Sequence, residues 1–187
     1  KGIGFLYIRK GVKIRSFGHG GAQERKRRAG TENVPGIVGM GAAVERAMRT
    51  METRTAKERK LRDYLIERIE TEIPYCRLNG DRTNRLPNNV NFSFRFIEGE
   101  SLLIMLDMKG ICASSGSACT SGSLDPSHVL LAIGLPHEIA HGSLRMTLGE
   151  ETTREDLDYT VDTLKEIVAN LRGMSPLYED FIKKQNA

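Results

Sequence analysis

The sequence of 187 residues contains no tryptophan, only three cysteines and no long hydrophobic run. The cysteines, Cys76, Cys112 and Cys119, form no CxxC pair, which argues against a disulfide framework or a structural zinc site. No apolar stretch approaches the ~20 residues that span a bilayer, and the first residues do not resemble a signal peptide. These absences predict no membrane partner, no metal and a reducing, cytoplasmic location.

An extended basic surface is also missing. The formal net charge is +4, and the local cluster Arg25–Arg28 is short and has no interleaved aromatic residue. Nucleic-acid binding needs a sustained basic face, usually with aromatic residues for base stacking. We therefore expect no nucleic-acid partner, and we interpret the cluster as a solvated or partner-facing loop.

Hydrophobic periodicity predicts an α/β fold. Alternation or helical spacing of apolar residues indicates each element, and Thr152 or Thr153 with Glu155 or Asp156 forms a capping-box pattern. The predicted strands are 3–8, 90–96, 110–113 and 143–148. Helices are predicted from a cap at Thr31 or Asn33 through Met48, along Leu61–Ile73, over 99–108, from Asp125 through Leu131, along Leu157–Leu171 up to Gly173, and from Ser175-Pro176 onward. A polar break is expected at Thr50–Thr55.

Cys119 lies within a run of small residues, Ser114–Ser123. Such a run offers little apolar area to offset the entropy of ordering it, so it predicts a mobile loop. Hydroxyls and glycines cannot enclose an apolar pocket, which favours Cys119 as a nucleophile over a buried thiol. By contrast, Cys76 and Cys112 are expected to be buried beside or within strands.

Three further patterns have competing interpretations. Arg145, on a predicted strand, is either a surface charge or a fork that binds a carboxylate. The glycines of residues 18–21 with Gly30 and Thr31 form either a phosphate cradle or a flexible loop. His137–His141 matches HExxH, but Pro136 and Gly142 leave barely more than one helical turn, too little for a zinc peptidase.

Together these residues resemble the C-terminal half of a cysteine desulfurase of the NifS/IscS-like group, within the class V aminotransferase family of pyridoxal-phosphate enzymes. The resemblance covers nearly the whole chain. It is carried by the motifs Gly20–Glu24, Arg28–Asn33, Ser114–Ser121, Pro126–Leu130, Ala140–Gly149 and Ser175–Tyr178.

The resemblance implies a role for three residues. Cys119 would form a persulfide with sulfur from the substrate L-cysteine, and Arg145 would bind the substrate carboxylate. Thr31 would contact the phosphate of the pyridoxal 5'-phosphate held by the neighbouring subunit, which implies a homodimer. The sulfur would then pass to an iron–sulfur scaffold protein or another acceptor. Selenocysteine lyase is a related alternative activity.

The resemblance also implies a domain division within a fold-type I transferase. Residues 1–51 would be the last strand, loop and helix of the large cofactor domain, and residues 52–187 the small C-terminal domain. The Schiff-base lysine would precede the segment that ends at Lys1-Gly2. By this interpretation the chain is truncated and inactive alone, and the alternative is a non-catalytic fragment that presents the thiol loop to a partner.

Overall fold

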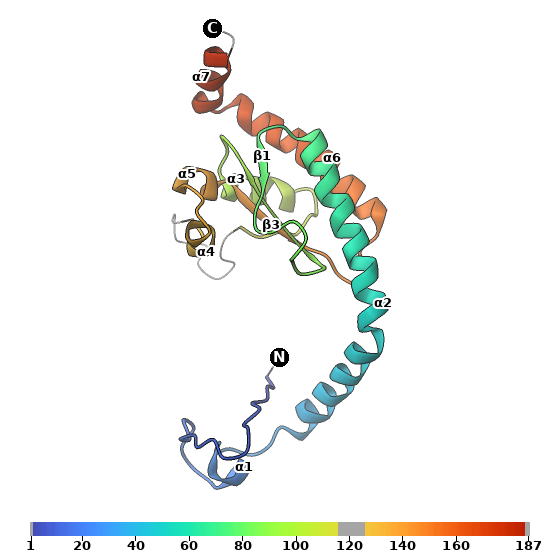
Figure 1. Cartoon of the computed structure of the whole chain (residues 1–187), viewed down its shortest axis with the longest axis vertical. Helices are drawn as coiled ribbons and strands as arrows, with labels where there is room; N and C mark the ends of the chain where they lie inside the picture. The colour runs from blue at the N-terminus through green and yellow to red at the C-terminus, as the bar shows by residue number, and fades with distance from the viewer. Residues whose placement is uncertain (1, 116–125, 186–187) are drawn as a thin grey trace. The chain divides into compact units, whose positions relative to one another are not determined.

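A computed structural model describes residues 2–115 and 126–185 of the chain (Figure 1). The chain divides into two compact units, Lys1–Glu52 and Thr53–Ala187. The second unit combines helices with a three-stranded sheet, which confirms the α/β class.

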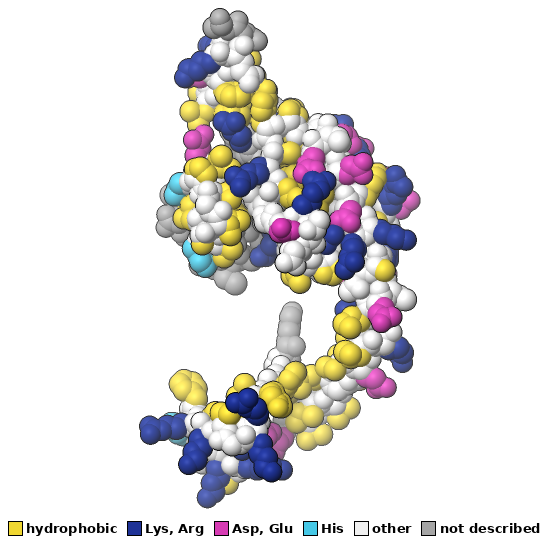
Figure 2. Space-filling view, viewed as in Figure 1, with side chains coloured by type: hydrophobic (Ala, Val, Ile, Leu, Met, Phe, Trp, Pro, Cys, Tyr) yellow, Lys and Arg dark blue, Asp and Glu magenta, His cyan; other side chains and the backbone are white. Residues whose placement is uncertain are grey.

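The first unit consists of extended chain, one turn and the start of a long helix. The turn α1 (Gln23–Lys26) has left-handed backbone angles at Glu24 and Arg25. The predicted strand at 3–8 is wrong, because these residues pair with no strand in the described part of the chain. The side chains of Phe5, Leu6 and Tyr7 are exposed. Figure 2 shows both hydrophobic and basic side chains on the surface of this unit.

Helix α2 (Val34–Glu72) is longer than predicted. It begins where expected, because the side chain of Asn33 accepts a hydrogen bond from the amide of Gly36 at 3.1 Å and caps the first turn. The expected break at Thr50–Thr55 is wrong: all these residues are helical. The hydroxyl of Thr50 donates to the carbonyl of Arg46 at 3.1 Å, a contact made within the helix.

The sheet of the second unit has the order β1-β2-β3 and is antiparallel throughout. Its strands are β1 (Cys76–Leu78), β2 (Asn89–Phe94) and β3 (Ser143–Thr147). In the central strand Phe92 pairs with Leu144 of β3, and both side chains are fully buried. The alternation of apolar residues predicted β2 and β3 correctly, although β2 ends before Phe96.

Five helices complete the second unit: α3 (Gly99–Asp107), α4 (His128–Ala132), α5 (His137–His141), α6 (Arg154–Gly173) and α7 (Pro176–Gln185). The predicted capping box is present, with the hydroxyl of Thr153 accepting from the amide of Asp156. Residues of α2, α3 and α6 bury their apolar sides with β2 and β3 in one core. This core holds β3 in place, and β3 carries Arg145.

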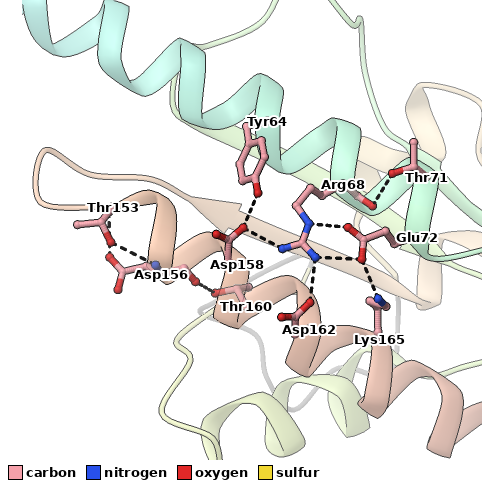
Figure 3. Close-up of polar contacts among 10 residues, drawn as sticks. All are labelled: Tyr64, Arg68, Thr71, Glu72, Thr153, Asp156, Asp158, Thr160, Asp162 and Lys165. Atoms are coloured by element: carbon pink, nitrogen blue, oxygen red, sulfur yellow. Dashed lines mark hydrogen bonds and ion pairs between the residues drawn. The ribbon is translucent and has the colours of Figure 1, made fainter.

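A polar network joins the second-unit part of α2 to α6 (Figure 3). The guanidinium of Arg68 binds Glu72 in its own helix and Asp158 and Asp162 in α6, the latter two at 2.9 Å. Lys165 also binds Glu72, at 2.7 Å. These bonds, above all the one from Arg68, lower the pKa of Glu72 from 4.5 to about 2.

We expect Arg68→Met to destabilise the protein by about 1–2 kcal/mol at neutral pH. Because the folded-state pKa of Glu72 is depressed, its contribution is full above pH 4.5 and is lost as the pH falls toward about 2. The free energy of unfolding of Arg68→Met should therefore fall less than that of the wild type between pH 4.5 and about 2. Urea unfolding at pH 7 and about pH 3 measures both effects.

Arg82→Met is the matched control, because Arg82 pairs with Glu70 at the surface with a side chain 60% exposed. An exposed pair contributes little, so this variant should unfold like the wild type. If the free energy of unfolding falls equally in Arg68→Met and in the wild type between pH 7 and about pH 3, the network around Arg68 is not the cause of the pH dependence of stability.

Candidate functional site

Arg145 lies near the middle of β3 and is half-buried. On one side its strand neighbour is Asn91 of β2. On the other side its backbone forms an isolated antiparallel bridge with Ser114, through bonds of 3.0 and 2.5 Å between the amide of each residue and the carbonyl of the other. The start of the serine-rich run is thus fixed to the backbone of the predicted carboxylate-binding arginine.

The predicted nucleophile Cys119 lies outside the described residues, as do the other residues of 116–125. What the structure describes is the preceding segment, which ends with the half-buried Ser114 and Ser115. Sequence reasoning grouped Ser114 with the thiol motif but did not place it beside Arg145.

The other two cysteines differ from each other. Cys76 begins β1 and is partly buried, and burial raises the pKa of its thiol to about 11. Cys112 is exposed, so the prediction that it is buried is wrong. The expected strand 110–113 does not form, and pairing with β3 begins at Ser114.

The loop before α2 is held by two internal hydrogen bonds. The amide of Ala29 donates to the carbonyl of Gly18 at 3.3 Å, and the amide of Gly30 donates to the side-chain oxygen of Gln23 at 3.2 Å. Gly30 has φ +104°, a left-handed angle that favours glycine. Thr31 follows and is exposed. Sequence reasoning missed the role of Gln23 in this loop.

The HExxH stretch forms the five-residue helix α5, in which the rings of His137 and His141 lie 5.2 Å apart. Within residues 2–115 and 126–185, no group of three or more His, Cys, Asp or Glu side chains could hold a metal ion. His141 and Glu138 instead line a hollow of about 480 Å³, which Phe96, Ser101 and Leu177 also line. Arg145 and Ser114 are not among its lining residues.

The α/β unit thus places the backbone of a strand arginine beside the start of the cysteine-bearing serine run. The family model described as "Aminotransferase class-V" matches residues 1–160. The chain therefore belongs to the class V aminotransferase family.

The curated relatives of the chain have names that are more specific than the family description. The chain is 58% identical to the cysteine desulfurase IscS of Clostridium botulinum (strain Hall) over 187 residues, covering 99% of this chain and 47% of that protein. It is 62% identical to the cysteine desulfurase IscS of Methanosarcina thermophila, covering 95% and 44%. The chain thus spans about half the length of these curated relatives.

Solved structures agree in fold. A NifS-like protein superimposes with a TM-score of 0.77 at 36% identity, covering 87% of this chain and 41% of that one. A second NifS-like protein, from Rickettsia africae, gives a TM-score of 0.75 at 29% identity, covering 83% and 40%.

Proposed function

We propose that this chain supplies the C-terminal half of a cysteine desulfurase, which converts L-cysteine to L-alanine and holds the released sulfur as a persulfide on Cys119. The observation that carries the proposal is the backbone bridge between Ser114 and Arg145. It ties the segment leading to the nucleophile directly to the residue that would bind the substrate carboxylate. The relatives named above support the same reaction.

Arg145 would bind the substrate through its carboxylate. A guanidinium donates two parallel hydrogen bonds to a carboxylate, which fixes both the position and the rotation of the amino acid. The backbone of Arg145 is held on both sides, by β2 and by Ser114, so the base of this side chain is rigid. A rigid base favours the exact placement on which the attack at sulfur depends.

Pyridoxal 5'-phosphate is the cofactor we propose, and this chain would contact its phosphate end. Thr31 offers an exposed hydroxyl next to the left-handed Gly30, where a Cβ would lie 2.8 Å from the guanidinium of Arg28. A hydroxyl and a nearby guanidinium fit a phosphate group. When bound, the cofactor supplies an electron sink for the substrate. Its Schiff-base lysine would come from outside this chain.

In the sulfur step, the thiolate of Cys119 attacks the sulfur of the bound cysteine. The new S–S bond forms as the C–S bond breaks, and the electron pair of that bond stays with the carbon skeleton, which leaves as alanine after protonation. Cysteine and an enzyme thiol thus become alanine and an enzyme persulfide. The atoms and electrons balance without an outside oxidant or reductant.

The persulfide would then pass to an acceptor, for which an iron–sulfur scaffold protein is our proposal. Because Thr31 would serve the cofactor of the neighbouring subunit, the working enzyme would be a homodimer. In the described part of the chain, every helix is too short or too polar to span a bilayer. We keep the cytoplasmic location as a prediction.

The proposal is tested on the full-length protein, purified with its cofactor. We expect one alanine per persulfide in a single turnover with L-cysteine, measured by amino-acid analysis and by intact mass, and localised to Cys119 by peptide mapping. Release of alanine without any persulfide on this residue would contradict the proposal. Faster turnover of selenocysteine than of cysteine would favour the lyase activity instead.

A further inference from the structure

Gly99, the first residue of α3, lies against the start of β3. It is buried, and a Cβ added to it would lie 2.8 Å from the carbonyl oxygen of His141 and 3.0 Å from that of Ser143. Contacts this close require the neighbouring atoms to move, and these atoms belong to the backbone rather than to flexible side-chain ends. Only glycine therefore allows α3 to approach β3 to this distance.

The same position also lies beside Ser115, the last described residue before the segment that carries Cys119. The added Cβ would lie 3.7 Å from the Cβ of Ser115, an ordinary contact. One residue earlier, Ser114 forms its bridge with Arg145. Gly99 contacts the carbonyl of Ser143, which lies two residues before Arg145 in β3. Gly99 therefore sits where the strand of Arg145 and the segment leading to Cys119 meet.

A second glycine, Gly142, also permits close backbone packing next to the start of β3. The carbonyl of Gly142 accepts a hydrogen bond from the amide of Phe94 at 2.8 Å, and a Cβ at Gly142 would collide with the carbonyl oxygens of Phe94 and Ile97. The turn between β2 and α3 and the entry to β3 are thus packed backbone to backbone. Such packing leaves little room to absorb an added methyl group.

We propose that Gly99 is a positioning residue that keeps the carboxylate-binding arginine and Ser114–Ser115, the described residues before the segment with Cys119, in one fixed relation. The inference rests on the proposed function. A methyl group at Gly99 pushes the carbonyls of His141 and Ser143, which displaces the start of β3. Because Ser114 is bonded to Arg145, the same displacement reaches Ser114, from which the chain leads to Cys119. Substrate binding and sulfur attack should therefore be impaired together.

The test compares Gly99→Ala with the wild type in the full-length holoenzyme, at equal cofactor content. Two quantities are measured: the dissociation constant for L-alanine, from the change in the cofactor spectrum, and the single-turnover rate of persulfide formation at saturating cysteine. We expect the dissociation constant to rise and the rate to fall, each about tenfold or more. Alanine binding involves no sulfur chemistry, so it reports on substrate binding separately from attack by the thiol.

Gly173→Ala is the matched control, because Gly173 is exposed and a Cβ there meets nothing within 4 Å. It should change each quantity less than twofold. If Gly99→Ala does not fold, Ser115→Thr adds one methyl group next to Gly99 from the opposite side, with the same expected result. If only one of the two quantities changes, or neither does, the proposal is overturned, because Gly99 is expected to affect both together.

A failure of the proposed function would look different. In that case the wild type itself would form no persulfide from cysteine. The dissociation constants for L-alanine would still show whether Gly99→Ala differs from Gly173→Ala. The two proposals therefore fail by separate observations.

Discussion

Replacing Cys119 by serine in the full-length protein is expected to abolish persulfide formation and to lower alanine release from cysteine about 10³-fold or more. A hydroxyl is scarcely ionised at neutral pH, whereas a thiol is a few per cent thiolate and is intrinsically far more nucleophilic. Intact mass after one turnover measures the bound sulfur, and amino-acid analysis measures the alanine.

Cys112→Ser is the control for this substitution. Cys112 is exposed and precedes the bridge residue Ser114 by two positions, so it tests whether any nearby thiol would serve. We expect it to retain the wild-type rate within about twofold, as is usual for a surface change. Full sulfur transfer by Cys119→Ser, or loss of transfer in Cys112→Ser, would assign the nucleophile elsewhere.

The second large effect is expected at Arg145. Arg145→Ala removes both hydrogen bonds to the substrate carboxylate, and bonds of a charged pair are each worth about 1.5–3 kcal/mol. We therefore expect kcat/KM for cysteine to fall about 10²-fold or more, mainly through KM. Arg145→Lys keeps the charge but not the two-pronged geometry, so its loss should be intermediate.

A substrate without a carboxylate separates a carboxylate contact from a structural effect. The wild type should prefer cysteine strongly over cysteine methyl ester, whereas Arg145→Ala should show almost no preference. Arg77→Ala, at an exposed position of β1 in the same sheet, should keep the wild-type preference. If Arg145→Ala still discriminates against the ester as the wild type does, the carboxylate is bound elsewhere.

Apart from the expected strand 110–113, which does not form, the sequence predicted most elements of the second unit because each of them carries its own local signal. Val90, Phe92 and Phe94 alternate with more polar residues and form β2, and Thr153 with Asp156 marks the first turn of α6. These signals lie within a few residues of one another. Tertiary packing reinforces them rather than overriding them.

The wrong predictions concern segments whose structure depends on distant partners. Residues 3–8 are apolar enough for a strand, but a strand needs a neighbour, and none is paired with them in the described residues. Threonines suggested a break at 50–55, yet arginine, glutamate and lysine around them favour helix and the helix continues. Local propensity thus accounts for the continuous helix, whereas the strand at 3–8 depends on a partner that the sequence does not reveal.

The candidate site was only partly predictable for the same reason. Arg145 stood out as a charged residue on an apolar strand, and the resemblance gave it a role. Gly99 looked like an ordinary residue at a helix start, because the carbonyls that it contacts lie more than 40 positions further along the chain. Spacing within a sequence does not reveal a close approach of two backbones.

The partial burial of Cys76 has a practical consequence for labelling chemistry. Its thiol, with a pKa of about 11, stays protonated at neutral pH and should resist alkylation in the folded protein. Maleimide probes would then find their targets among the remaining two cysteines. A Cys112→Ser background would leave Cys119 as the site for a fluorophore or spin label, without mutating the interior of the sheet.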